Sequence, residues 1–179
     1  MSKKVLVITF SQRKGSNSDA LAAEFARGAK DAGNNVEVIS LKEKNIQFCK
    51  GCLACQQTKR CVIQDDASLI EEKMEHADVL VFATPIYYYE MSGQMKTMLD
   101  RGNPLFTTEY AFRDVYLIAT AADEEYSACQ GAENGLRGWI SCFPKAKLAG
   151  TVFGGGVTIE NDIRGKKVLE EAYQTGKKV

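Results

Sequence analysis

Four cysteines, which are Cys49, Cys52, Cys55 and Cys61, fall within 13 residues and are separated by two, two and five residues. Three thiolates at two-residue spacing can wrap one iron–sulfur cubane, and a fourth can close the site from the next turn. Zinc bound by four thiolates is an alternative, although paired knuckles are more usual for zinc than one tight cluster. A set of free or disulfide-forming thiols is another. In a reducing compartment, such a cluster indicates metal or redox chemistry rather than a disulfide framework.

A polar loop rich in hydroxyl groups, Ser11–Ser18, follows the apolar run Val5–Phe10 and precedes a helical pattern of apolar residues. A strand, a short polar loop and a helix in this order aim backbone N–H groups at a bound anion. The nucleotide patterns G-x-x-x-x-G-K-[ST] and G-x-G-x-x-G are both absent from the loop. The loop therefore predicts a cradle for a single phosphate. The alternative is that Ser16 or Ser18 serves only as the N-cap of the helix.

Three consecutive tyrosines stand in the stretch Pro85–Gly93, directly after the apolar run Asp78–Thr84. Pro85 forces an extended entry into this stretch and removes one N–H. The backbone groups of Ile86–Tyr89 can face a planar heterocycle, with tyrosine rings against it, and Gly93 would allow a close backbone approach. The alternative is a hydrophobic rim or a dimer contact. Together with the phosphate cradle, a flat apolar site favours flavin mononucleotide (FMN).

The elements that must position these motifs alternate between apolar strands and amphipathic helices. Strands are predicted at 5–10, 36–39, 78–84, 114–120 and 147–153, and the last helix at 162–175. With no internal repeat and no linker, this alternation predicts one α/β domain over residues 1–179, a parallel sheet with helices on both faces. Five strands suit the doubly wound order 2-1-3-4-5, which places ligands at the carboxyl ends of the strands. The loops 11–18, 85–93 and 120–126 should then meet.

These motifs also carry a family resemblance. The chain resembles the flavodoxin-like NAD(P)H-dependent FMN reductases over nearly its whole length, most clearly at Ser11–Ser18, Thr84–Tyr89 and Ser92–Arg101. The resemblance implies a flavodoxin-like three-layer sandwich. It also implies that the FMN phosphate is held by Ser11, Arg13, Ser16, Asn17 and Ser18. The isoalloxazine ring would be wrapped by Pro85, Ile86, Tyr87, Tyr88 and Tyr89 and by the loop that starts at Thr120 and Ala121.

The cysteine spacing resembles the compact motif of the iron–sulfur flavoprotein branch of the same family. It differs from the bacterial ferredoxin run, whose fourth cysteine follows at a spacing of three and precedes proline. Here five residues separate Cys55 from Cys61, and Val62 comes next. The resemblance implies a [4Fe-4S] cluster ligated by Cys49, Cys52, Cys55 and Cys61 that exchanges electrons with FMN.

The predicted function is that of an FMN-dependent oxidoreductase, which takes hydride from NAD(P)H and passes electrons to a quinone, a free flavin or an electron carrier. The cofactor carries this chemistry, so no catalytic protein residue is predicted. One alternative is an iron–sulfur flavoprotein that only shuttles electrons between protein partners. Another is a thiol redox sensor on a flavodoxin scaffold. A hydrolase is not expected, because the single histidine, His76, has no matching nucleophile.

The charge balance restricts the possible partners. There are 23 basic and 23 acidic residues, which argues against binding to nucleic acid or to an anionic membrane surface. No apolar run approaches the ~20 residues of a membrane span, and residues 1–4 leave no room for a signal peptide before the first strand. We therefore expect a cytoplasmic protein whose partner is a small-molecule or protein electron acceptor. The family resemblance implies a homodimer or homotetramer.

Two further predictions concern residues outside these motifs. Cys129 and Cys142 have no motif, so buried apolar thiols are expected at both positions. Asp65 and Asp66 precede a helical pattern and are predicted to form its N-cap.

Overall fold

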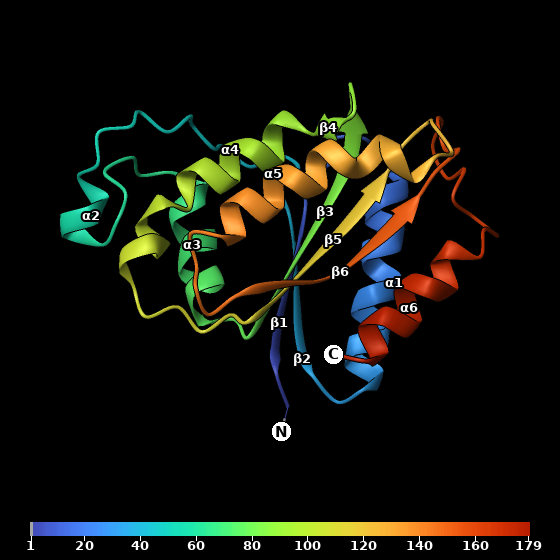
Figure 1. Cartoon of the computed structure of the whole chain (residues 1–179), viewed down its shortest axis with the longest axis horizontal. Coiled ribbons are helices and arrows are strands. Elements are labelled where there is room, and N and C mark those ends of the chain that lie inside the picture. The colour runs from blue at the N-terminus through green and yellow to red at the C-terminus, as the bar shows by residue number, and fades with distance from the viewer. Residues whose placement is uncertain (1) are drawn as a thin grey trace.

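The computed structural model describes residues 2–179, which form one parallel sheet between two layers of helices (Figure 1). Its five parallel strands follow the order β2-β1-β3-β5-β6. They are β1 (Lys4–Thr9), β2 (Asn35–Ser40), β3 (Val79–Tyr87), β5 (Asp114–Thr120) and β6 (Lys147–Gly154). A short strand, β4 (Glu90–Met91), pairs antiparallel with the end of β3. The predicted order 2-1-3-4-5 of the parallel strands is therefore confirmed.

Helices cover both faces of the sheet, as expected for a three-layer sandwich. Figure 1 shows α1 (Asn17–Asp31) and α6 (Val168–Lys177) on one side. On the other side lie α3 (Asp66–His76), α4 (Gly93–Arg101) and α5 (Gln130–Ile140). The small helix α2 (Cys55–Thr58) projects beyond the sheet, and 3-10 turns occupy Asn103–Thr107 and Tyr126–Cys129.

Both faces of the central strands pack into hydrophobic clusters, one under each helical layer. Residues Val5–Thr9 of β1 are all buried, and so are Val79–Thr84 of β3. This double burial explains why the two strands read as unbroken apolar runs rather than as alternating patterns. Within residues 2–179, no helix combines the length and the apolar character needed to cross a bilayer.

Helices α1 and α6 touch through their backbones at two glycines. A Cβ at Gly28 would lie 2.0 Å from the carbonyl oxygen of Tyr173, and a Cβ at Gly176 would lie 2.0 Å from that of Phe25. No side chain fits at either position without moving a helix. The contact is reinforced by Arg27, whose guanidinium lies 4.0 Å from the centre of the Tyr173 ring.

The segment Pro85–Gly93 departs from the predicted loop. The strand β3 continues through Pro85 to Tyr87, and a tight turn at Tyr88 and Tyr89 leads back into β4. Both turn residues have positive φ, 51° and 63°. A two-residue turn of this kind normally uses asparagine or glycine, so the tyrosines gave no hairpin signal.

Two other predictions need correction. The last helix begins at Val168 rather than at 162, because the Asp162 carboxylate accepts hydrogen bonds from the N–H groups of Thr158 and Ile159 and holds a turn there. Cys142 is exposed in the turn after α5, whereas Cys129 is buried as predicted. The N-cap of α3 is Asp65, whose side chain accepts from the Ala67 N–H.

Candidate functional site

The three loops predicted to meet do meet, at the carboxyl ends of β1, β3 and β5. They surround a cavity of about 210 Å³, together with a fourth segment at Val157 and Thr158. The predicted binding residues that line it are Ser11, Arg13, Ser16, Asn17, Pro85, Ile86, Tyr87, Thr120 and Ala121. Ala122 completes the lining.

The polar wall of this cavity is the N-terminus of α1. The Ser16 side chain caps the helix by accepting from the Asp19 N–H at 3.3 Å, and its Oγ lies 3.0 Å from the Oγ of Ser18. The N–H groups of Asn17 and Ser18 belong to the first helical turn and therefore have no acceptor within the helix. Free N–H groups, hydroxyls and the positive end of the helix dipole form a donor set that fits a phosphate.

The side chains of Asn17 and Arg13 form hydrogen bonds with the backbone of the 157–163 segment. The Asn17 amide donates to the Ile159 carbonyl at 2.9 Å and accepts from the Ile163 N–H at 3.2 Å. The Arg13 guanidinium donates to the Thr158 carbonyl at 2.6 Å. These bonds hold the 157–163 segment against the mouth of the cavity. The Asn17 side chain is thus an anchor for this segment, which leaves its backbone N–H as the group free to meet an anion.

Val157 and Thr158 are lining residues that the sequence interpretation missed. They follow three glycines, 154–156, and this glycine run is the sequence feature that indicates a close approach of the backbone here. A Cβ at Gly155 would lie 2.7 Å from the Glu124 carbonyl oxygen and 2.8 Å from that of Asp123. Only glycine therefore lets the segment pass so close to the 120–126 loop and reach the cavity.

Four predicted binding residues lie outside the cavity lining. Tyr88 is fully exposed at the hairpin turn, and the Tyr89 hydroxyl lies 3.4 Å from the Asp123 carboxylate, a contact that joins the hairpin to the 120–126 loop. Ser18 is fully buried behind Ser16. Gly93 lines a different hollow, shared with Gln12, Ile46 and Phe48.

The four motif cysteines line one small cavity of about 20 Å³ beside α2. Figure 1 places α2 at the opposite end of the long axis from the 157–163 segment. Cys55 is buried and Cys61 is half-buried, whereas Cys49 and Cys52 are exposed. Among residues 2–179, no three histidine, cysteine or acidic side chains are arranged to hold one metal ion.

The cysteine arrangement therefore does not fit a single zinc ion, which needs its sulfurs to converge at about 2.3 Å from one point. A cubane cluster places each thiolate on a different iron, so its ligands surround a volume instead. The four thiols supply the donor set of such a cluster, and the cavity between them, at about 20 Å³, would have to widen to admit it.

A buried arginine, Arg101, donates hydrogen bonds to residues on both sides of the cysteine segment 49–61. Arg101 is 1% exposed, and its Nη1 donates to the Asp65 carboxylate at 2.6 Å and to the Gln47 carbonyl at 3.1 Å. Its Nη2 donates to the Ile63 carbonyl at 3.2 Å. Burial raises the pKa of Asp65, but hydrogen bonds from Arg101 and from two backbone N–H groups outweigh it and leave the pKa lowered.

Glu71 is the second acidic residue beside Arg101, and its neighbours only partly offset the cost of burying its charge. Its Oε1 lies 3.7 Å from Arg101 Nη2 and has no hydrogen-bond partner among the described residues. Burial raises the pKa of Glu71 to about 7, against the opposing attraction of Arg101. Between about pH 4.5 and 7, the folded protein thus holds a proton that the unfolded chain has lost. Stability should fall as the pH rises through this window.

We expect Glu71→Gln to remove this pH dependence, because glutamine keeps the shape of the side chain and cannot ionise. The free energy of unfolding should rise by about 2 kcal/mol at pH 8 and change little at pH 4.5. Urea unfolding at the two pH values measures the difference. Glu72→Gln, at an exposed neighbouring position, should have no such effect. An equal effect of Glu71→Gln at both pH values would contradict the assignment.

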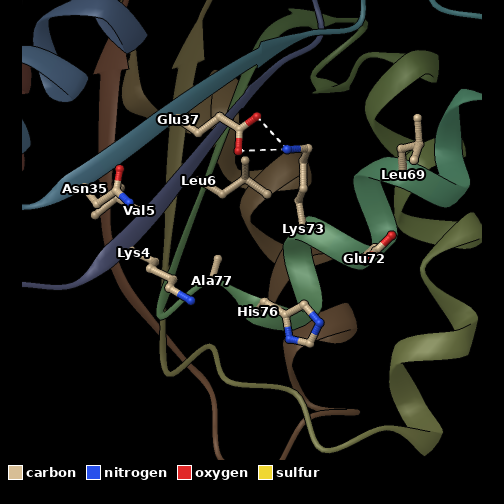
Figure 2. A pocket seen from close by; sticks show the side chains of 10 residues that line it. All are labelled: Lys4, Val5, Leu6, Asn35, Glu37, Leu69, Glu72, Lys73, His76 and Ala77. Carbon is tan, nitrogen blue, oxygen red and sulfur yellow. Dashed lines mark hydrogen bonds and ion pairs between the residues drawn. The ribbon is translucent and has the colours of Figure 1, made fainter.

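Another hollow, of about 390 Å³, lies at the opposite end of the strands, beside the edge strand β2 (Figure 2). It is bridged by an ion pair between Lys73 and Glu37, at 2.8 Å. His76 and Glu72 also line it. The opposite charges offset one another within this hollow, and no donor set like that of the α1 N-terminus is present among its lining residues.

Comparison with known proteins gives consistent results. The profile of a family described as NADPH-dependent FMN reductase matches residues 3–157. An iron-sulfur flavoprotein of Methanocaldococcus jannaschii is 35% identical over 102 residues, which cover 57% of this chain and 53% of that protein. YwqN of Bacillus subtilis, named for an NAD(P)H-dependent FMN-containing oxidoreductase, is 33% identical over 128 residues, 67% of each chain. The chain spans about half the length of three iron-sulfur flavoproteins that it matches.

The fold is also found in solved structures. An NAD(P)H:quinone oxidoreductase from Methanothermobacter marburgensis superposes with a TM-score of 0.72, over 99% of this chain and 98% of that one. At 16% sequence identity, this likeness shows the shared flavodoxin-like fold.

Proposed function

The chain belongs to the NADPH-dependent FMN reductase family, and from this membership we propose that it is an oxidoreductase that binds FMN in the cavity between α1, β3 and β5. The observation that carries the proposal is the joining of two surfaces in one cavity. One surface is the capped N-terminus of α1, which suits the phosphate. The other is the flat stretch Pro85–Tyr87, which suits the isoalloxazine ring.

Bound FMN would accept hydride from NAD(P)H and pass electrons to a second substrate. The residues of the chain bind and orient. The Asn17 N–H group and the Ser16 hydroxyl would hold the phosphate, while Pro85, Ile86 and Ala121 would border the ring. The described residues that line the cavity include no histidine, lysine, aspartate or glutamate. The protein therefore supplies position rather than proton transfer.

The test is to titrate the purified apoprotein with FMN and then to measure NAD(P)H oxidation with a quinone, a free flavin or a protein carrier as acceptor. The proposal expects one FMN per chain and turnover that depends on FMN. Protein that binds no FMN would refute it. Binding without NAD(P)H turnover, but with electron uptake from reduced ferredoxin, would favour an electron shuttle instead.

We propose a second role for the cysteine segment, that of holding a [4Fe-4S] cluster. Support comes from the four thiols around one cavity and from the names of the relatives, several of which are iron-sulfur flavoproteins. The cluster would exchange single electrons, and Cys49, Cys52, Cys55 and Cys61 would be its ligands.

Iron and sulfide analysis after purification without oxygen tests this role. Stoichiometric iron and sulfide would support it. Flavin without iron would leave free thiols, and a change of oligomeric state on thiol oxidation would then favour the redox sensor. A homodimer or homotetramer and a cytoplasmic location remain predictions.

A further inference from the structure

The wall of the cysteine cavity contains an amide that contacts one of the sulfurs. The Nδ2 of Asn103 donates to the Sγ of Cys55 at 3.2 Å. Asn103 is half-buried, stands at the start of the 3-10 turn after α4 and lines the same cavity as the four cysteines. Its side chain makes no other hydrogen bond within residues 2–179. The amide is therefore held by the sulfur alone.

This contact is chemically unusual for a structural role. A neutral thiol is a weak acceptor, and an amide N–H gains little from it. A thiolate carries negative charge and is a stronger acceptor, since hydrogen bonds to charged groups are roughly twice as strong. The geometry thus provides a donor that becomes valuable when the Cys55 sulfur carries charge, as it does when bound to iron.

Two other donors lie near the motif cysteines: one contacts a cysteine sulfur from outside the cavity lining, and the other lines the cavity without contacting a sulfur. The Gly51 N–H donates to the Sγ of Cys49 at 3.4 Å, and its φ of +63° places it in a conformation that favours glycine. Arg101 also lines the cavity, and its Nε is buried without a hydrogen-bond partner among the described residues. All three features are suited to a group of negative charge held by the cysteines.

We propose that Asn103 is a positioning residue for the cysteine site, where its amide orients the Cys55 sulfur and stabilises the reduced, more negative form of a thiolate-bound iron–sulfur cluster. This inference rests on the proposed cluster. Hydrogen bonds to ligand sulfurs raise the reduction potential of such clusters, because they favour the state with the extra electron. Reduction adds one electron from the titrating reductant and transfers no proton to Asn103.

The experiment compares wild type with Asn103→Leu, which has a side chain of similar size and no donor. Both proteins are purified without oxygen and titrated with dithionite against redox dyes, and the spectrum of the cluster is followed. The ratio of reduced to oxidised cluster at a fixed potential should fall about tenfold in the variant, the effect expected from one lost hydrogen bond to a charged group. Tenfold corresponds to 59 mV for one electron.

Thr107→Val is the matched control. Thr107 lies in the same 3-10 turn, and its hydroxyl donates to the Pro104 carbonyl without contacting a cysteine. This variant loses one hydrogen bond of the turn and should keep the wild-type potential. FMN affinity should be unchanged in both variants, because the flavin cavity lies at the other end of the molecule.

The outcomes separate the two proposals. Wild-type protein that contains FMN but no iron would overturn the cluster and the role of Asn103 together. Wild-type protein with a cluster, and a potential that is equal in Asn103→Leu, would overturn the role of Asn103 alone. An equal shift in Thr107→Val would also overturn it, because the effect would then come from the turn and not from the sulfur contact.

Discussion

Replacing Arg101 with methionine should lower the free energy of unfolding by about 3–5 kcal/mol, the usual cost of breaking a buried ion pair from one side. The side chains of Arg101 and Asp65 are 0% and 1% exposed. Without the guanidinium, the Asp65 carboxylate loses its cation, and the Gln47 and Ile63 carbonyls lose a donor. Chemical denaturation at neutral pH measures the effect.

Two variants show whether the loss comes from this network. Lys96→Met removes another cation of α4, whose partner Asp100 is 50% exposed, and should change stability by less than about 1 kcal/mol. The double variant Arg101→Met/Asp65→Asn should be more stable than the sum of the single changes predicts. Asparagine keeps the N-cap of α3 and leaves no buried charge. Strict additivity would argue against a coupled network.

Replacing Ser16 with aspartate should weaken FMN binding by about 100-fold or more, because it places a carboxylate where the phosphate is proposed to lie. Aspartate is as good an N-cap as serine, so α1 should remain intact and stability should be unchanged or slightly higher. Titration of flavin fluorescence gives the dissociation constant, and thermal unfolding checks the fold.

Asn34→Asp is the matched control for the added charge. The Asn34 Oδ1 accepts from the Lys3 N–H at the opposite end of the sheet, and an aspartate oxygen can make the same bond. FMN affinity should stay within about twofold of wild type, since salt screens charges that are more than about 10 Å apart. If Ser16→Asp binds FMN as tightly as wild type, the phosphate does not lie at the N-terminus of α1.

Much of the fold is predictable from the sequence because its signals are local. The strands β1, β3 and β5 lie inside the sheet, and burial on both faces makes them continuous apolar runs. Strand order then follows from the repeated strand–helix alternation. The carboxyl ends of parallel strands lie at the same edge of the sheet, so the loops that follow β1, β3 and β5 are expected to meet there.

The parts that could not be predicted depend on contacts between distant residues. Asn17 reads as a phosphate ligand, but its side chain is bonded to Ile159 and Ile163, more than 140 positions away. Arg101 reads as one more charge at the end of a helix, and only the folded chain brings Gln47, Ile63 and Asp65 around it. The hairpin turn at Tyr88 and Tyr89 uses residues that rarely adopt positive φ, so no local sequence signal indicates it.

The glycine contact between α1 and α6 also affects when the N-terminal part of the protein can complete its packing during synthesis. The helix that carries the phosphate cradle leaves the ribosome early, but its Gly28 backbone packs against a helix made almost a full domain later. Glycine is a poor helix former, so α1 gains much of its support only when residues 168–177 dock. A nascent chain stalled before residue 168 would carry the cradle residues without the helix that packs against α1, and cofactor loading would await the docking of residues 168–177.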